Sequence, residues 1–399
     1  MKCKITNKVI KPFMSFGKMP IANGFIKKED FKKEFFFNME VGFSEDLSLF
    51  QLKDHPTPDQ MFNSKYPFFT ASSEYMKIHF SKYAKFIKDN YLKDNSKIIE
   101  IGSNDGTFLQ NFRNTNLDII GFEPSSNVAE IANKTGAKTL NNFFNQDSIN
   151  QINKFKNKTD VIYAANVICH VPDLNDLIKS IDKLLSKEGV FIFEEPYLGA
   201  MFEKTSYDQI YDEHIFMFSG SSIQKIFNLF DMELIDLIKQ PTHGGSMRYV
   251  VSRKGYHKIK PSVEKILGEE KFKNLDNLNS CLQFKSDCEN SKNKLKKMLF
   301  DYKNQGKKIA GYAATSKSTT VLNYCGIGSE TIDYICDTTK EKINKYSPGM
   351  HIPIVSIDHF KNNMPDIAYL FAWNHKEEIF NKETKFKEEN RKWVSHIDL

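Results

Sequence analysis

Glycines and acids are grouped in residues 98–109, IIEIGSNDGTFL, in an order that could bind a nucleotide-like ligand. An apolar run ends at an acid, a glycine turn follows, and an expected helix begins directly after it. In a doubly wound sheet this order brings backbone amides against a ligand. The spacing is not GxGxxG, and the acid precedes the turn, which favours the amino-acid end and ribose of S-adenosylmethionine over a pyrophosphate. The residues expected to bind it here are Glu100, Gly102, Asn104, Asp105 and Gly106.

Two further strands end in polar residues at what should be the same edge of the sheet. LDIIGFEPS at 117–125 ends in Glu123 and Pro124, roughly twenty residues after the turn, where a carboxylate can accept both ribose hydroxyls. DVIYAANVICHVPD at 160–173 places Asn166 and His170 at the end of the third strand. An ordinary strand-helix bend is the alternative for one glycine turn alone. Three polar strand ends together favour a methyl-donor site.

Ionisable groups are concentrated in SYDQIYDEHIFMFSG at 206–220, directly before an aromatic run. Tyr211, Glu213 and His214 could therefore lie beside an apolar wall that shifts their pKa values. Histidine can act as a base near neutral pH. The alternative is a surface loop whose acids cap the next helix and whose histidine is solvated.

Three other segments carry candidate ligand-binding groups. His243 precedes two glycines in PTHGGSMRYVV, where the backbone can approach a ligand, although a tight turn would need the same residues. Tyr66 lies in an aromatic group that could cover the site. The loop with Tyr312, Thr315 and Lys317 precedes a helix, and its amides, hydroxyls and lysine could hold a diphosphate. A helix cap with a solvated lysine is the alternative there.

Composition restricts the class of protein. The net charge of +6 arises from 56 basic against 50 acidic residues spread along 399 residues, without the basic stripe that nucleic-acid binding needs. Six cysteines form no CxxC pair, which indicates a reducing compartment. The first twenty residues lack an apolar core of signal-peptide length, and no later apolar run approaches the length of a membrane span. We therefore expect a cytoplasmic protein with no membrane or nucleic-acid partner, and a monomer.

The elements predict an α/β protein of several parts. A helix over 74–93 has Met76, Phe80, Tyr83 and Ile87 on one face. Alternating strands and helices then run to about 252, including a helix over 173–189 that should end at Gly189 as a C-cap. A second, shorter alternation fills the C-terminal part. We predict an N-terminal module (1–73), a Rossmann-like methyltransferase domain (74–254), a helical connector (255–305) and a smaller Rossmann-like domain (306–399).

Motifs along nearly the whole chain resemble one family in the same order. They are IEIGSNDGTFLQNF, GFEPSSNVAEIA, ANVICHVPDL, EEPYL, YDQIYDEHIF, THGGSMR, KIAGYAATSKSTTVLNY, SPGMHIPI and FAWNHKEEI. They are similar to the sugar C-methyltransferases of the C-3 type, which act on nucleotide-linked 4-keto-deoxyhexoses with S-adenosylmethionine. The resemblance implies an N-terminal module that usually holds zinc, a methyltransferase domain, and a C-terminal domain that helps to hold the sugar nucleotide.

The resemblance also implies roles for particular residues. His214 corresponds to the general base, with Tyr211 and Glu213 beside it, and His170 to an active-site histidine. Tyr66 corresponds to the first of two tyrosines, and the second is Phe68 or Phe69 here. We expect Tyr197, in EEPYL, to contact the substrate with His243.

The chain departs from the family at the metal site. The two CxxC pairs that family members usually carry read CKIT and SEDL, so Cys3, Thr6, Ser44 and Leu47 hold a single thiol. One thiol cannot make a four-ligand zinc site, and we predict none. Aromatic packing should hold the module together instead.

The expected chemistry is base-assisted methyl transfer to carbon. A carbon next to a ketone is weakly acidic, so a base must remove its proton while donors stabilise the enolate oxygen. We expect His214 to take the C3 proton, with His170, Tyr211 or His243 donating toward the C4 oxygen. Two alternatives remain open from the sequence: an O- or N-methyltransferase with the same base, and a non-catalytic protein that binds a sugar nucleotide.

Overall fold

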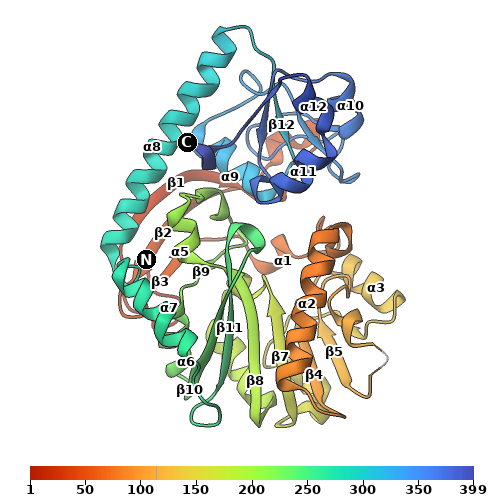
Figure 1. The fold of residues 1–399 in the computed structure, drawn as a ribbon, viewed down its shortest axis with the longest axis vertical. Helices are drawn as coiled ribbons and strands as arrows, with labels where there is room; N and C mark the ends of the chain where they lie inside the picture. The colour runs from red at the N-terminus through yellow and green to blue at the C-terminus, as the bar shows by residue number, and fades with distance from the viewer. Residues whose placement is uncertain (114) are drawn as a thin grey trace.

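The computed structural model describes residues 1–113 and 115–399, whose strands form three sheets (Figure 1). The first sheet is antiparallel, with strand order β1-β2-β3-β9. Its fourth strand comes from the middle of the chain, so this sheet is not confined to the N-terminal residues. The strands are β1 (Pro12–Pro20), β2 (Phe36–Ser44), β3 (Leu49–Leu52) and β9 (Phe216–Met217).

The second sheet has seven strands in the order β10-β11-β8-β7-β4-β5-β6. In chain order its first five strands take the 3-2-1-4-5 arrangement of a doubly wound sheet and run parallel. β11 then pairs antiparallel with both β8 and β10. The strands are β4 (Lys97–Ile101), β5 (Asp118–Phe122), β6 (Thr139–Leu140), β7 (Thr159–Ala165), β8 (Leu185–Pro196), β10 (Met232–Gln240) and β11 (Ser246–Arg253).

The third sheet is parallel and has a similar order, β14-β13-β12-β15-β16. Both predicted Rossmann-like sheets are therefore confirmed. The strands are β12 (Ile309–Tyr312), β13 (Ile335–Asp337), β14 (Ile354–Ser356), β15 (Ile367–Leu370) and β16 (Lys392–Val394). The helix α8 (Leu278–Asn304) runs along one side of the molecule and joins the second sheet to the third (Figure 1).

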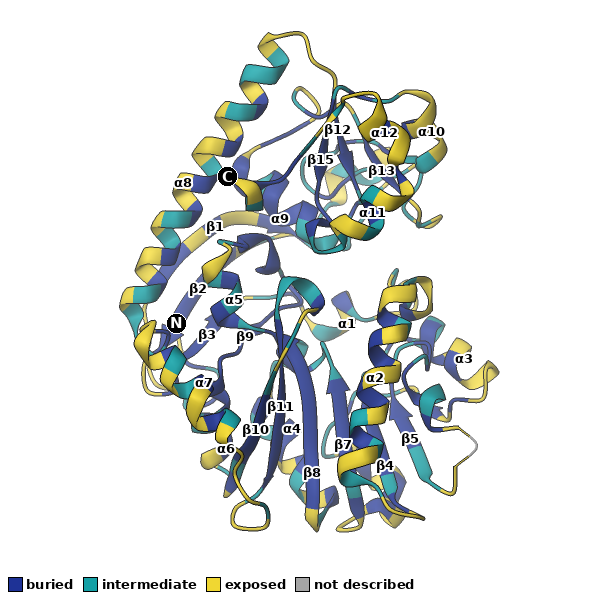
Figure 2. Ribbon diagram, in the orientation of Figure 1, coloured by how far each residue is buried: buried dark blue, intermediate teal, exposed yellow. Residues whose placement is uncertain are grey.

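Helices cover the sheets, and their buried faces alternate with exposed ones, whereas the central strands are buried (Figure 2). The helices before α8 are α1 (Pro58–Met61), α2 (Glu74–Tyr91), α3 (Ser126–Lys134), α4 (Leu174–Leu184), α5 (Leu198–Glu203), α6 (Gly220–Asn228) and α7 (Pro261–Phe272). Those after it are α9 (Ser316–Cys325), α10 (Ile357–Asn362), α11 (Lys376–Lys382) and α12 (Thr384–Glu388). None of the helices in the described residues has both the length and the apolar composition of a membrane span.

The helix α2 follows the predicted pattern. Met76, Phe80, Tyr83 and Ile87 are buried in one cluster with Phe108. The Ser73 side chain caps the helix by accepting a hydrogen bond from the Met76 amide. The apolar stripe of the sequence is therefore the face that packs on the second sheet, and the predicted helix is confirmed over Glu74–Tyr91.

The N-terminal strands have no separate core. Phe13 and Phe43 belong to one hydrophobic cluster with Leu198, Phe284 of α8 and Ile309 of β12. A small module cannot bury enough apolar surface alone, and here it lies between the other two sheets.

The predicted C-cap at Gly189 is wrong. α4 ends at Leu184 and β8 begins at the next residue. Pairing of β8 with β7 steps from Leu185 opposite Thr159 to Val190 opposite Val161, which leaves residues 186–189 as a bulge. A Cβ on Gly189 would lie 2.5 Å from the Thr159 carbonyl oxygen. Glycine is required here by close backbone approach within a sheet, not by the end of a helix.

Candidate active site

A cleft of about 1410 Å³ opens at the carboxyl ends of β4, β5 and β7. Residues of the N-terminal segment, such as Asn23 and Tyr66, form part of its wall, and Lys317 and Lys342 contribute from the C-terminal part. All three parts of the chain therefore meet around one cavity. The predicted residues that line it are Tyr66, Glu100, Gly102, Asn104, Glu123, Pro124, Asn166, His170, Tyr211, Glu213, His214, His243, Tyr312, Thr315 and Lys317.

The glycine turn after β4 brings backbone to the cleft. Gly102 has φ of +70°, and a Cβ there would lie 2.3 Å from Cγ2 of Val167. Gly106 has φ of +80°, and its Cβ would lie 2.5 Å from the Ala137 side chain. Both the left-handed backbone and the close packing require glycine. Gly106 packs below the turn and is not part of the wall.

Two acidic side chains form hydrogen bonds that hold the turn in place. Glu123, at the end of β5, accepts hydrogen bonds from the amides of Asn104 at 3.0 Å and Ser125 at 2.7 Å. Burial raises the pKa of Glu123 above its usual value. Asp105 accepts from the Ala71 amide at 2.8 Å, so it fastens the N-terminal segment to the turn. Asp105 does not line the cleft, so we do not place it among the groups that would touch a ligand.

Two other strand ends contribute polar atoms. Glu100, on β4, accepts a hydrogen bond from the Tyr163 hydroxyl at 3.1 Å, and burial raises its pKa well above the usual value. Asn166 follows β7 with φ of +56°, and its amide donates to the Glu194 carbonyl at 2.8 Å. The Asn166 side-chain oxygen is buried without a hydrogen-bond partner in the described residues. Such an atom is costly unless a ligand reaches it.

His214 is held by two short contacts. Its Nδ1 lies 2.7 Å from the Gln209 carbonyl oxygen, and its Nε2 lies 2.7 Å from the Tyr211 hydroxyl. A carbonyl can only accept, so Nδ1 carries the hydrogen and Nε2 keeps its lone pair. Burial lowers the pKa of His214 well below its usual value. The ring is therefore a neutral imidazole with a basic nitrogen, which is the form that a general base requires.

His170 lies directly beside His214. Its ring stacks on His214 with centroids 5.3 Å apart and on Phe62 with centroids 5.6 Å apart. Burial lowers the pKa of His170 to about 3, and its Nε2 has no hydrogen-bond partner in the part of the chain that is described. The stacked pair therefore offers a base and a second neutral ring nitrogen in one place.

A carboxylate pair lies next to His214. Glu213 accepts from the Tyr66 hydroxyl at 3.3 Å and from the Asn23 side-chain amide at 2.6 Å. The adjacent Asp212 accepts from the Ala22 amide at 2.9 Å. Burial raises the pKa values of both acids, and repulsion from Glu213 adds to the rise at Asp212. Asn23 was not anticipated, because no motif in the sequence distinguishes it.

The C-terminal wall carries lysines. Lys317 donates to Asn374 at 3.2 Å and lies over the Trp373 ring, with Nζ 4.6 Å from its centroid. Lys342, which was not anticipated either, donates to the Ala314 carbonyl at 2.8 Å. Burial lowers the pKa of both lysines. Thr315 caps α9, its hydroxyl accepting from the Ser318 amide.

Of three residues expected to contact the substrate, Tyr197 and Tyr312 direct their hydroxyls to glutamates elsewhere, and His243 lies in the cleft. The Tyr197 hydroxyl donates to Glu270 at 2.9 Å, and Tyr197 does not line the cleft. The Tyr312 ring does line it, but its hydroxyl donates to Glu383 at 3.0 Å. His243 has φ of +53°, and its buried Nε2 lacks a partner among the residues described. The contact with Glu270 directs the Tyr197 hydroxyl toward α7, not toward the expected substrate position.

Cys169, His170 and His214 bring potential ligand atoms within 4.8 Å of one another. Both ring nitrogens of His214 are already hydrogen-bonded, and burial raises the pKa of the Cys169 thiol well above its usual value. A metal ion here would need to displace Tyr211 or Gln209 and take the proton from a buried thiol. The geometry fits proton transfer better than metal binding.

Comparison with known proteins agrees with this arrangement. Three family models match consecutive segments: a putative zinc binding domain at residues 3–62, a methyltransferase domain at 75–237, and a C-methyltransferase C-terminal domain at 241–397. The C-methyltransferase NovU of Streptomyces niveus is 27% identical over 387 residues, 96% of this chain and 92% of its own. The chain is therefore similar to C-methyltransferases along nearly its whole length.

More distant proteins match parts of the chain. The tRNA U34 carboxymethyltransferase of Sulfurimonas denitrificans is 27% identical over 165 residues, 40% of this chain and 50% of its own. The magnesium protoporphyrin IX methyltransferase of Synechocystis, solved with bound SAH, is 12% identical and has a TM-score of 0.36. It covers 45% of this chain and 83% of its own.

The protein is thus an S-adenosylmethionine-dependent C-methyltransferase, and its cleft fits this cofactor. The Gly102 backbone lines the cleft without a side chain. Glu123 has lone pairs left after its two amide contacts, and the Asn166 oxygen is unpartnered within the described residues. Carboxylate and amide oxygens suit ribose hydroxyls and an amino group.

The zinc implied by the first family model does not fit this chain. Only Cys3 among the four ligand positions offers a thiol, and it is buried in one hydrophobic cluster with Ile5, Leu47 and Leu49. A structural zinc site needs four nitrogen or sulfur ligands. Leucine at one position and threonine and serine at two others cannot supply them.

Proposed function

We propose that this C-methyltransferase acts on a nucleotide-linked 4-keto-deoxysugar, and that His214 removes a proton from the carbon that is methylated. The observation that carries the proposal is the neutral His214 ring, whose basic Nε2 lies in the same cleft as the glycine turn. Nδ1–H is held by the Gln209 carbonyl, which would also stabilise the imidazolium that forms after proton transfer.

The reaction needs donors as well as a base. When the C3 proton moves to His214 Nε2, the Tyr211 hydroxyl must turn its hydrogen away from that nitrogen, and negative charge develops on the C4 oxygen of the substrate. Tyr211, His170 and His243 are the candidate donors, and the buried Nε2 atoms of the two histidines, unpartnered within the described residues, favour them. S-adenosylmethionine, when bound, supplies an electrophilic methyl group. Glu123 and Asn166 would hold its ribose and amino-acid parts, with the turn from Gly102 to Asn104.

The substrate class is supported by the C-terminal wall. Lys317 and Lys342 are half-buried lysines on that wall, and Lys317 lies in the first turn of α9. Cationic side chains and the N-terminus of a helix suit a diphosphate. We therefore propose that the nucleotide diphosphate lies against these groups and that the sugar extends toward His214 and Tyr66.

Other expectations stay proposals. We keep the division of the chain at residues 73, 254 and 305, a monomer without nucleic-acid partners, an N-terminal module without zinc, and a reducing cytoplasm. The last is supported by six cysteines that are all free thiols.

The proposal is tested with His214→Asn and His214→Ala, with His257→Asn as a control at a histidine outside the cleft. S-adenosylmethionine binding is measured by calorimetry and turnover with a panel of nucleotide-linked 4-keto-deoxyhexoses. We expect both His214 variants to bind the cofactor like the parent protein but to give no product. The parent product should show a methyl singlet on a quaternary carbon. A methoxy or N-methyl signal, or turnover by His214→Asn, contradicts the proposal.

A further inference from the structure

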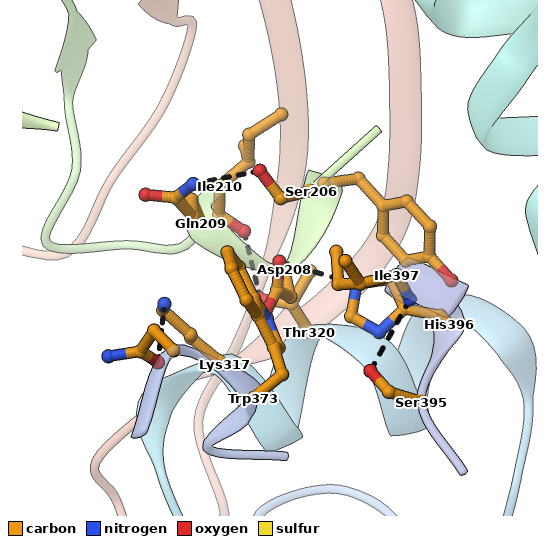
Figure 3. A network of polar contacts seen from close by, with 12 residues as sticks. Ser206, Asp208, Gln209, Ile210, Lys317, Thr320, Trp373, Ser395, His396 and Ile397 are labelled. Carbon is orange, nitrogen blue, oxygen red and sulfur yellow. Dashed lines mark hydrogen bonds and ion pairs between the residues drawn. The ribbon is translucent and has the colours of Figure 1, made fainter. Parts of the chain in front are cut away.

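The segment just before His214 contacts residues from the far end of the chain (Figure 3). Asp208, in the short helix η6 (Tyr207–Gln209), is completely buried. Its Oδ2 accepts a hydrogen bond from the Trp373 indole at 2.6 Å. Its Oδ1 lies 3.3 Å from Nε2 of His396. Both partners belong to the C-terminal part, more than 160 positions further along the sequence.

His396 is itself fixed by Tyr369 of β15. The Tyr369 hydroxyl accepts from the His396 backbone amide at 3.2 Å and lies 2.9 Å from its Nδ1. The hydroxyl hydrogen is then free to donate to Nδ1, which places the ring hydrogen on Nε2. Nε2 and Asp208 Oδ1 are within ion-pair distance but do not have hydrogen-bond geometry. Burial alone would raise the pKa of Asp208, but His396, Lys317 and the Trp373 indole bring it below its usual value. Asp208 is therefore a charged carboxylate within a buried polar network.

The two residues after Asp208 connect this network to the base. The Gln209 carbonyl accepts from His214 Nδ1 at 2.7 Å. The Ile210 carbonyl accepts from the Thr320 hydroxyl of α9 at 2.8 Å. Asp208 and Ile210 thus contact the C-terminal part, and Gln209 between them contacts His214. Neither Asp208 nor Thr320 lines the cleft, so neither can touch the substrate.

We propose that Asp208 is a positioning residue, which through Trp373 and His396 fixes the Gln209 carbonyl against His214 and so keeps the basic lone pair on Nε2. This inference rests on the proposed function, because it assigns Asp208 a role through His214. In this proposal the C-terminal part also positions the catalytic histidine, besides binding substrate. A carbonyl that moved away would let the other imidazole tautomer form, with its hydrogen toward Tyr211 and no base facing the cleft.

The first measurement is the tautomer of His214, read from ¹⁵N chemical shifts of protein labelled in its histidine rings. The protein has 10 histidines, and the spectrum of His214→Asn identifies the signals of this one. We expect a protonated Nδ1 and an unprotonated Nε2 in the parent protein. Asp208→Ala should mix the two tautomers, and Asp208→Asn, which keeps an acceptor for Trp373, should lie between them.

The second measurement is turnover of the same variants. We expect Asp208→Ala to lower kcat about tenfold to a hundredfold, the loss that a misplaced catalytic group produces, while the Kd of S-adenosylmethionine changes less than about twofold. Asp208→Asn should restore part of the rate. The matched controls are Asp236→Ala and Asp236→Asn, at a buried acid that binds Lys260 outside the cleft. Their kcat and His214 shifts should equal those of the parent.

The outcomes separate the two proposals. An unchanged His214 tautomer in Asp208→Ala, with kcat within about twofold of Asp236→Ala, would overturn the positioning role. If Asp208→Ala does not fold, Asp208→Asn carries the same test, because it preserves the buried volume closely. If His214→Asn retains turnover but Asp208 still controls the tautomer, the base assignment fails and the positioning stands.

Discussion

Replacing Gly102 by alanine tests whether the glycine turn forms the cofactor site. The backbone there has φ of +70°, and the new Cβ would lie 2.3 Å from Cγ2 and 2.9 Å from Cγ1 of Val167. Gly326 provides a matched control, since its φ is +62° but its Cβ would meet nothing within 4 Å. Gly326→Ala should therefore lower the free energy of unfolding by about 1–2 kcal/mol, from the backbone alone. Gly102→Ala should lower the free energy of unfolding by about 1–3 kcal/mol more than Gly326→Ala, because its Cβ overpacks against Val167.

The functional effect should follow the collision with Val167 and not the backbone strain. We expect S-adenosylmethionine to bind at least about tenfold more weakly to Gly102→Ala, a loss of about 1.4 kcal/mol, and normally to Gly326→Ala. Val167→Ala removes both colliding methyl groups and leaves a contact of 3.2 Å to its Cβ. The double variant should recover the extra loss, which a double-mutant cycle measures as a coupling energy.

Urea unfolding gives the stabilities, and calorimetry gives the cofactor affinity. Equal destabilisation in Gly102→Ala and Gly326→Ala would show that the packing against Val167 is looser than the structure has it. Unchanged cofactor affinity in Gly102→Ala would contradict the assignment of the turn to the cofactor.

The remaining predictions concern pH, a buried ion pair and metal. A general base must be unprotonated, and burial lowers the pKa of His214 well below 6.5. We therefore expect kcat to stay constant as the pH decreases from 8 to 6.5, where His214 limits the rate. A kcat profile with a midpoint at or above pH 6.5 would contradict this. Glu194 lies 2.5 Å from Arg248 and 2.6 Å from His79, all buried, so Glu194→Ala should cost about 3–5 kcal/mol in urea unfolding. Asp89→Ala, which breaks an exposed pair with Lys85, should cost less than about 1 kcal/mol, and similar losses at the two sites would refute the reasoning. Chelator should leave Tm unchanged, and stoichiometric zinc in metal analysis of the purified protein would refute the prediction of an N-terminal module without zinc.

Much of the fold can be predicted from the sequence because local signals agree with it. The stripe of Met76, Phe80, Tyr83 and Ile87 and the strand-turn order at Gly102 each have a physical cause within a few residues. The predicted helix end at Gly189 is wrong because its position depends on a distant part of the chain. Only the pairing of β8 with β7 makes residues 186–189 a bulge, and no short-range pattern reports a partner strand.

The site shows the same division between local and distant causes. His170, Glu123 and His214 could be selected because polar residues at strand ends and next to apolar runs are unusual. Asn23 and Lys342 could not, because they enter the cleft from loops with no motif, through contacts with Glu213 and Ala314. Tyr197 was misplaced because the side on which its ring lies depends on Glu270 of α7, 73 residues further along.

The most direct test of the account is exchange of the C3 hydrogen of a nucleotide-linked 4-keto-deoxyhexose in D₂O, with S-adenosylhomocysteine in place of the methyl donor. This separates proton removal from methyl transfer. The account predicts that the parent protein exchanges this hydrogen and that His214→Asn leaves it at the rate of the substrate alone. Equal exchange by the two proteins would contradict the claim that His214 is the base.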